Sequence, residues 1–460
     1  MSAVAVWARR GRPRRLAVAV TVAALLASGG IGGATAATQA KNASGSSPGP
    51  IRVLTPDTAP SGQARPEAVA VPQAVHTGAG WVQHPLMAKV QGWKSATSPQ
   101  LTTTTPTGYT PEQLRSYLHL TGTGKGQTVA VVDAFDNPYA AADLATYSKK
   151  FGLPEPCGKS SKPGCFTFSS VHPFGVLGAD PGWALESDLD VQMVHAIAPD
   201  ASIVLVEAYD NSFLHMTQAI DYAAGLHAGV ISNSYGGSEY SGETSADGHC
   251  ALASALCVFS TGDTGNPGEY PAYDPHVLAV GGTTFSLASS GDVDFETAWC
   301  CSNNGGAVGT GGGLSAFEPR PAYQDSVNSF QHRAIPDVSF DADPATGVPV
   351  YDTFGLSGQN GWFQVGGTSA GAPAWAGIVA AADQLRAKAK QPPLAGAGFQ
   401  AQKLIYGMPH DVFRDITTGV NNALECDTPI ETCQAKPGYD PVTGWGGPKA
   451  GIDAALAAAR

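Results

Sequence analysis

Short apolar runs separate longer amphipathic stretches from about residue 108 to the C-terminus. The runs are nearly continuous, as the buried strands of a parallel sheet are, and they cover residues 127–134, 201–208, 229–235, 256–262 and 276–282. The stretches around them predict helices at "YTPEQLRSYLHL" and near residues 138–150, 181–197, 211–228 and 247–255. This alternation predicts one α/β domain with a mostly parallel sheet and helices on both faces.

The N-terminal 100 residues do not follow this pattern. Five arginines precede the apolar run Leu16–Leu26, and the stretch "GGATAA" offers a cleavage site near Ala36. Together they predict a signal peptide over residues 1–36 and a secreted protein. Residues 37–100 are rich in Ala, Ser, Thr, Pro and Gln and predict a low-complexity linker or short propeptide. The folded domain is expected over residues 101–460.

Composition narrows the class of partners. The net charge is -12, and removing the five N-terminal arginines makes it -17. Only 14% of the residues are charged, so no basic surface is expected for nucleic acid or for an anionic membrane. No later segment is long and apolar enough to span a bilayer.

Eight cysteines in a chain with a predicted signal peptide indicate disulfides. Three pairs are close in sequence: Cys157 with Cys165, Cys250 with Cys257, and Cys426 with Cys433. The adjacent Cys300 and Cys301 either bridge each other or have separate partners.

A serine in "GGTSAGAP" has the surroundings of a nucleophile. Ser369 follows Gly366, Gly367 and Thr368, and residues 370–378 predict the start of a helix. Subtilisin-like proteases present their serine on such a turn, but they need a histidine base, and no His-Gly-Thr-His stretch occurs here. His195 lies late in its predicted helix and is expected to be a packing or surface residue.

The predicted helix 181–197 carries two acids that lie four residues apart. Asp180 is its expected N-cap, and Glu186 and Asp190 fall on one face beside the apolar stripe. Asp188 is expected to point toward solvent. Two inward carboxylates repel, so one pKa should rise or the pair should share a proton. The alternative is an ordinary solvated acidic face.

Two further acids follow predicted strands, at the sheet edge where ligands of open α/β sheets bind. Asp263 stands in the Gly-flanked turn "STGDTG", and Asp133 ends the run "VAVVDA". An aspartate in a turn is also common for local hydrogen bonding alone.

In combination, these stretches resemble the sedolisins, the serine-carboxyl peptidases with a subtilisin-like fold. The resemblance runs from about Gly108 to the C-terminus and rests on "GYTPEQLR", the ExxxD helix, "VISNSYG", "STGDTG", "YPAYDPHVLAVGGT", "PRPAYQ", "IPDVSFDADPATG", "GGTSAGAP", "DIT" and "GYDPVTGWG". It implies that Ser369 is the nucleophile, Glu186 the base, Asp190 its orienting partner and Asp263 a protonated oxyanion donor. Asp133 matches a position where some relatives extend the carboxyl network with a glutamate.

The resemblance also implies one structural Ca²⁺ near the C-terminus. Its ligands would be the carboxylates of Asp415 and Asp440 and the carbonyls of Ile416, Lys436 and Gly438, all of them oxygen atoms, as a hard cation prefers. Turn capping by the two aspartates is the alternative.

The resulting expectation is a secreted, monomeric serine-carboxyl endopeptidase that acts on proteins or peptides at acidic pH. A carboxyl group donates a hydrogen bond only while it is protonated, which favours acidic conditions. The alternatives are a neutral subtilisin-like protease using Asp133 and a histidine, and an inert secreted binding module on a peptidase scaffold.

Overall fold

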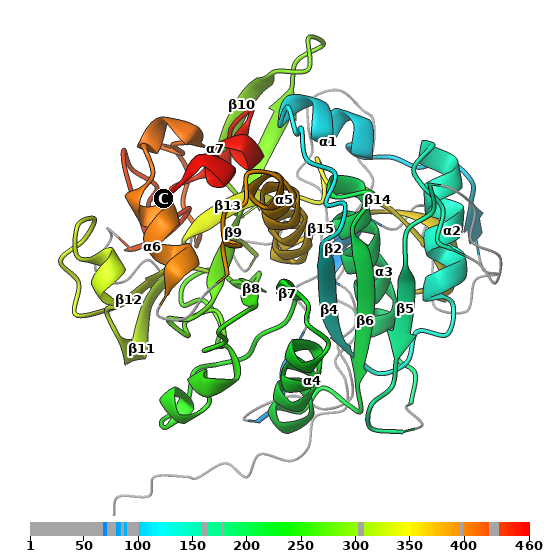
Figure 1. The fold of residues 1–460 in the computed structure, drawn as a ribbon, viewed down its shortest axis with the longest axis horizontal. Helices are drawn as coiled ribbons and strands as arrows, with labels where there is room; N and C mark the ends of the chain where they lie inside the picture. Colours follow the sequence, from blue (N-terminus) through cyan, green and yellow to red (C-terminus); the bar gives the residue numbers. More distant parts are fainter. Residues whose placement is uncertain are drawn as a thin grey trace, which may run out of the picture. The chain divides into compact units, whose positions relative to one another are not determined.

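A sheet of eight strands runs through the described part of the chain (Figure 1). The computed structural model describes residues 68–70, 80–83, 87–89, 101–157, 164–175, 178–301, 308–395, 399–422 and 432–460, all within the unit Pro48–Arg460. The strand order is β10 (Val293–Ala298), β9 (Leu278–Leu287), β8 (Leu256–Ser260), β7 (Val230–Asn233), β4 (Thr128–Ala134), β6 (Ser202–Ala208) and β5 (Phe168–Val171), with β13 (Val338–Asp341) beside β9. Every pair is parallel except β10 with β9.

The apolar pattern predicts five of these strands and misses two parallel ones. Strands β4, β6, β7, β8 and β9 coincide with the five apolar runs. Strand β5 reads "FSSV" and is mostly half-buried, so it lacks the continuous apolar run of a central strand. Strand β13 reads "VSFD", and its polar residues are buried with the apolar ones.

Helices cover both faces of the sheet, as predicted. Their bounds are α1 (Pro111–Tyr117), α2 (Ala140–Phe151), α3 (Pro181–Ile197), α4 (Phe213–Gly225), α5 (Thr368–Lys388), α6 (Gln400–Gly407) and α7 (Ile452–Ala458). Along β4, Val129 and Val131 join the core that contains α3 and α5, whereas Ala130 and Val132 join the core that contains α4. Alternate residues of one strand therefore serve two hydrophobic layers.

One predicted helix is wrong. Residues 247–255 form only a 3-10 turn, η2 (Asp247–His249), after a similar turn, η1 (Glu243–Ser245). Gly248 lowers the helix propensity of the segment. The Cys250–Cys257 disulfide then returns the chain to β8 within seven residues.

A second sheet leads into α5. Strands β14 (Val348–Leu356) and β15 (Gln359–Gly366) form an antiparallel hairpin. The sheet also includes β1 (Ala68–Ala70), β2 (Met87–Lys89) and β3 (Leu101–Thr103). Two short stretches of the predicted linker thus pair as strands with this sheet.

The remaining elements are short. They are β11 (Gly313–Pro319) with β12 (His332–Ile335), β16 (Phe413–Arg414) with β17 (Gly447–Pro448), η3 (Ala322–Gln324) and η4 (His410–Val412). Within the described ranges, no helix has both the length and the hydropathy to cross a membrane. The predicted signal peptide lies outside those ranges.

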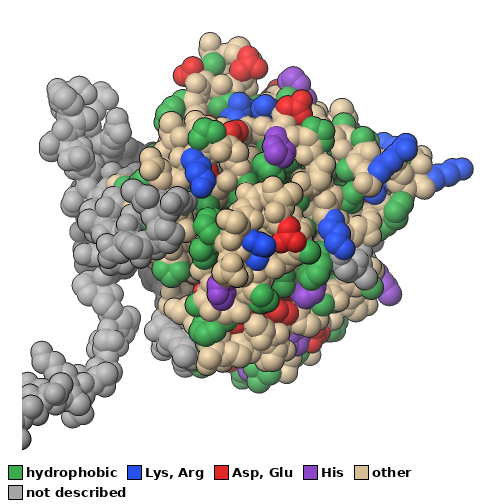
Figure 2. Space-filling view, turned by 90° about the vertical axis from the view of Figure 1, so that its left-hand side faces the viewer, with side chains coloured by type: hydrophobic (Ala, Val, Ile, Leu, Met, Phe, Trp, Pro, Cys, Tyr) green, Lys and Arg blue, Asp and Glu red, His purple; other side chains and the backbone are tan. Residues whose placement is uncertain are grey.

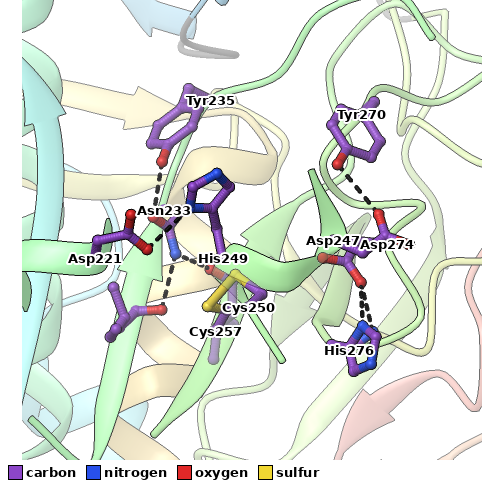
Figure 3. The surroundings of a disulfide bond; sticks show 12 residues. Asp221, Asn233, Tyr235, Asp247, His249, Cys250, Cys257, Tyr270, Asp274 and His276 are labelled. Carbon is purple, nitrogen blue, oxygen red and sulfur yellow. Dashed lines mark hydrogen bonds and ion pairs between the residues drawn. A yellow bond between two sulfur atoms is a disulfide. The ribbon is translucent and has the colours of Figure 1, made fainter. Parts of the chain in front are cut away.

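The structure forms three of the predicted or considered disulfides: Cys157–Cys165, Cys250–Cys257 and the vicinal Cys300–Cys301. Cys433 is also disulfide-bonded, and its predicted partner Cys426 lies outside the described residues. Figure 3 shows the Cys250–Cys257 bridge near Asn233, whose side-chain amide donates to Val258 O of β8 at 3.3 Å.

Charged side chains are sparse and scattered on the face drawn in Figure 2. Many of the acidic residues lie inside the protein instead, among them Asp133, Glu186, Asp190, Glu207 and Asp337. Charges that are buried need partners or a changed protonation state, so the surroundings of each of these acids show whether it serves structure or chemistry.

Candidate active site

Ser369 lies in the first turn of α5, directly after β15 delivers the chain into the middle of the described fold (Figure 1). Gly367 has φ of 97°, a conformation that a residue with a Cβ rarely adopts, and it makes the sharp strand-to-helix turn. The Ser369 side chain is buried. The predicted serine turn is therefore present, and its hydroxyl is held in the interior of the fold.

Helix α3 carries Glu186 and Asp190, and it packs against α5. Asp180 caps it as predicted, since its Oδ1 accepts hydrogen bonds from Gly182 N (2.9 Å) and Trp183 N (3.1 Å). The prediction of a solvent-facing Asp188 is wrong, because that side chain is buried and its Oδ2 accepts a hydrogen bond from Asn137 at 3.0 Å. Helix α3 is buried all round, so a one-face pattern does not apply to it.

Glu186 interacts electrostatically with each of the other predicted catalytic residues. Burial raises the pKa of Glu186 well above its usual range, and Asp190, Asp133 and Asp263 raise it further by charge repulsion. The nearby Ser369 hydroxyl favours the ionised form of Glu186 and so acts in the opposite direction. The five side chains, predicted from separate stretches of the sequence, form one electrostatic cluster.

Asp190 is fixed by a residue that the sequence reasoning did not single out. Ser234, just after β7, donates from Oγ to Asp190 Oδ1 at 2.8 Å and lies 3.3 Å from the carbonyl oxygen of Ser369. Burial and the charge of Asp133 raise the pKa of Asp190, while the bond from Ser234 lowers it. Ser234 follows the carboxyl end of a buried strand, where ligands of open sheets bind, but a serine in that place becomes significant only once the sheet aligns it with Asp190.

Asp263 is anchored to the residue before the serine. Its Oδ1 accepts hydrogen bonds from Thr368 N (2.8 Å) and Thr368 Oγ1 (2.9 Å). Its Oδ2 is buried and has no hydrogen-bond partner among the described residues. Burial raises the pKa of Asp263 well above its usual range, and buried Glu269 adds to the shift. A protonated Oδ2 is thus a donor without a protein acceptor, beside the serine turn.

Asp133 is buried at the end of β4. Burial, followed by the charge of Glu207, raises the pKa of Asp133 to about 8, and the nearby Ser187 hydroxyl opposes this shift. Glu207 belongs to this cluster too and was missed, because it continues the apolar run of its strand without a turn signal.

Residues 80–83 form an extended segment that pairs with Gly236, two residues after Ser234. Gln83 N donates to Gly236 O at 2.7 Å and Gly236 N to Gln83 O at 2.9 Å, which is an antiparallel bridge. Val82 is buried and pairs through its backbone with Asn211. A cavity of about 620 Å³ adjoins this edge and is lined by Trp81, Gln83, Gly237, Ser238, Thr264, Glu269 and neighbouring residues.

Comparisons with known proteins agree with this arrangement. A profile of the subtilase family matches residues 181–401, which include the serine turn and helix α3. Kumamolisin from Bacillus sp. (strain MN-32) is 32% identical over 372 residues, which are 75% of this chain and 62% of kumamolisin. Tripeptidyl-peptidase 1 from Dictyostelium discoideum is 27% identical over 390 residues, 74% of this chain and 56% of that protein. The chain thus spans about three fifths of the length of these relatives.

A solved structure gives the same answer for the fold. Pseudomonas sedolisin, a serine-carboxyl proteinase complexed with two molecules of pseudo-iodotyrostatin, matches with a TM-score of 0.61 and 24% identity, over 77% of this chain and 98% of that one. The chain is therefore similar to the sedolisins in sequence and in fold. The predicted subtilisin-like fold is confirmed.

The predicted calcium ligands of this chain border one turn near its C-terminus. Gly438 N donates to Asp415 Oδ2 at 3.0 Å, and Lys436 N donates to Asp440 Oδ2 at 2.9 Å. The other oxygen of Asp440 accepts from Val442 N and Thr443 N. Burial raises the pKa of Asp440 to about 6. Two carboxylates that enclose one turn fit an oxygen-ligand site, and their hydrogen bonds equally make the turn caps of the alternative reading.

Three other groups of side chains in the described part of this chain have potential metal-ligand atoms within 4.8 Å of one another. They are Asp136–His172–Glu207, Asp247–Asp274–His276 and Asp143–Asp188–Asp352. Figure 3 shows the second group, in which His276 Nδ1 lies 2.8 Å from Asp274 Oδ1.

Proposed function

We propose that this chain is a secreted serine-carboxyl endopeptidase that hydrolyses peptide bonds at acidic pH. The observation that carries the proposal is the convergence of Ser369, Glu186, Asp190 and Asp263 on one buried site, in which Glu186 has the place of a base. The similarity to kumamolisin supports a peptidase activity. We also propose that the protein is a monomer and that its substrates are peptides or proteins.

The mechanism divides the work among these residues. Ser369 Oγ attacks the carbonyl carbon of the scissile peptide bond, and Glu186 accepts the hydroxyl proton. Glu186 then returns that proton to the leaving amine. Asp190, held by Ser234, orients Glu186. Asp263 Oδ2, protonated, donates a hydrogen bond to the developing oxyanion.

The upward pKa shift of Asp263 supports an acidic working range, and the upward pKa shift of Glu186 limits that range at its lower end. Asp263 must be protonated to act as a donor, and its raised pKa keeps it so at acidic pH. Glu186 must be ionised to act as a base, so turnover falls when the pH drops far enough to protonate it. A histidine would be charged, and useless as a base, under the same conditions.

The edge at Gly236 supports a peptide substrate. Residues 80–83 show that this edge accepts an extended backbone by antiparallel pairing. Antiparallel main-chain pairing of this kind is one way in which proteins bind extended peptides. Residues that line the adjoining cavity would then contact the substrate side chains.

A structural Ca²⁺ at the C-terminal turn is the second part of the proposal. Asp415 and Asp440 would supply carboxylate oxygens, and Ile416, Lys436 and Gly438 peptide carbonyls. Calcium-binding relatives in the family support it. Removal of calcium with a chelator is expected to lower the melting temperature, and re-addition of Ca²⁺ to restore it, while Asp415→Asn should make the protein insensitive to both.

The decisive experiment is cleavage of a protein substrate between pH 3 and pH 8 by wild type, Ser369→Ala and Glu186→Gln. Activity confined to acidic pH and lost in both variants supports the proposal. Activity that peaks at neutral pH, or that survives Glu186→Gln, contradicts it. No cleavage at any pH favours the inert binding module. Mass spectra of the products separate internal cleavage from stepwise release of tripeptides.

A further inference from the structure

A row of titratable side chains crosses the carboxyl ends of β4, β6 and β5, which lie side by side in Figure 1. Asp133 of β4 is in register with Glu207 of β6, and both are buried. Val171 of β5 pairs with Val206, so His172, the next residue, is level with Glu207 on its other side. Paired residues of neighbouring strands point to the same face. The row therefore leads from the active-site cluster to the surface, where the His172 side chain is 40% exposed.

Glu207 is surrounded by donors. Asn137 N donates to its Oε1 at 2.6 Å, and its Oε2 is bonded to the Ser170 hydroxyl and to His172 Nε2. The titratable groups that face it are Asp133 from β4, Asp136 from the loop after β4 and His172 after β5; Asp136 lies 3.2 Å from His172 Nε2. Burial raises the pKa of Glu207, while all three donors favour its carboxylate form.

Asp133 has fewer hydrogen-bond donors than Glu207 to stabilise a negative charge. Both of its carboxyl oxygens are buried without a hydrogen-bond partner among the described residues, and the Ser187 hydroxyl donates to Trp183 O at 2.9 Å instead. Burial and the charge of Glu207 therefore dominate and raise the pKa of Asp133. When the two neighbouring acids hold one proton between them, that proton therefore belongs on Asp133. Neutral Asp133 does not repel a Glu186 carboxylate, whereas ionised Asp133 does.

We propose that Glu207 and His172 are positioning residues of the proposed reaction: the Glu207 carboxylate, paired with His172, holds a proton on Asp133 so that Glu186 can ionise and receive the proton of Ser369. This inference rests on the proposed peptidase function. It assigns an outer part of the machinery to two residues that touch neither the substrate nor Ser369.

The test uses the full chain and the pH dependence of kcat/KM. In Glu207→Gln, Asp133 loses the charge that keeps it protonated, ionises at lower pH and repels Glu186. The acidic limb of the profile should therefore move to higher pH by about one unit. His172→Gln, at an exposed position, should move it the same way by less, because uncharged glutamine leaves Glu207 easier to protonate. A purely structural role would lower kcat/KM at all pH values without moving the limb.

The matched control is His249→Gln. His249 Nδ1 pairs with Asp221 at 2.9 Å (Figure 3), and the two side chains are 36% and 53% exposed. This variant should leave the limb in place. Acidic limbs of Glu207→Gln and His172→Gln that coincide with wild type overturn the proposal.

A second readout does not need enzyme activity. Infrared difference spectra of wild type against Asp133→Asn identify the carbonyl band of the protonated Asp133 carboxyl group. In Glu207→Gln this band should disappear at lower pH than in wild type. An unchanged titration of the band overturns the inference even if the enzyme is active. A shifted band in a protein without peptidase activity supports the coupling and contradicts the proposed function.

Discussion

Two sites with fully buried carboxyl groups, one around Asp337 and one around Glu186, have opposite electrostatic surroundings. Asp337 is paired with Arg333 by two hydrogen bonds of 3.1 and 2.8 Å, and Tyr406 OH and Ala279 N also donate to it. Both members of the pair have no exposed side-chain surface. Glu186 is equally buried, but its charged neighbours are the acids Asp190, Asp133 and Asp263.

The difference separates structure from chemistry. A buried carboxyl group bonded to a guanidinium and to further donors joins structural elements, here β12 and the start of β13. Carboxyl groups without a cation hold protons instead, with a pKa displaced toward the range in which proton transfer is useful. One site is neutralised by a fixed partner and the other by protons, which can move.

The largest expected effect comes from Glu186→Gln. Loss of the proposed base should lower kcat/KM by about 100- to 10,000-fold. Because glutamine also removes a buried acid that its neighbours repel, the free energy of unfolding at pH 7 should not fall. Peptide hydrolysis and urea unfolding of the same preparation measure both quantities. A variant that unfolds more easily and loses activity in proportion would assign Glu186 to structure.

Asp337→Asn is the matched change in the other group. It leaves the Arg333 guanidinium without a buried counter-charge, which typically costs about 3–5 kcal/mol. We expect a lower free energy of unfolding in urea, with normal kcat/KM for the fraction that remains folded. If Asp337→Asn were as well tolerated as Glu186→Gln, the proposed division between the two groups would be wrong.

Asp263 gives a smaller effect with a pH signature. Asp263→Ala removes the proposed oxyanion donor and should reduce kcat by about 100- to 1,000-fold. Asp263→Asn keeps an N–H donor at every pH, so it should retain more activity than the alanine variant. Its activity should also extend to higher pH, where the wild-type carboxyl group ionises. Equal pH profiles for Asp263→Asn and wild type would show that the donor proton does not set the alkaline limb.

The sequence predicted the proposed catalytic residues better than their surroundings. Ser369 and Asp263 stand in Gly-rich turns after strands, and Glu186 in a helix with a capped start, so each has a local signal. Ser234 and Glu207 lack one, because a serine after a strand and an acid inside an apolar run become significant only when the sheet aligns them.

The fold, too, was predicted correctly only where a local sequence pattern was present. Continuous apolar runs identified the central strands, but β5 is half polar and half exposed, and periodicity does not detect such a strand. Asp188 was placed in solvent by helix geometry, which is valid only for a helix with one exposed side. Contacts between distant segments buried all of α3, and no local pattern contains that information.

Measured per pH unit, the pH dependence of stability is the smallest effect, and it tests the protons held by the acids around Glu186. Asp133 has an ordinary pKa near 3.8 in the unfolded chain and about 8 in the folded one. The native state therefore binds more protons between these values, and stability must fall as the pH rises from 4 to 8. One such group contributes at most about 1.4 kcal/mol per pH unit. Urea unfolding at intervals of one pH unit should show this decline.

Asp133→Asn should make the decline shallower, because asparagine has no proton to lose. Asp325→Asn, at an aspartate whose side chain is 59% exposed, is the control and should leave the slope unchanged. A wild-type stability that rises from pH 4 to 8 would mean that these acids are ionised in the folded protein. Glu186 would then be surrounded by charges rather than protons, and the contrast with the Arg333–Asp337 pair would disappear.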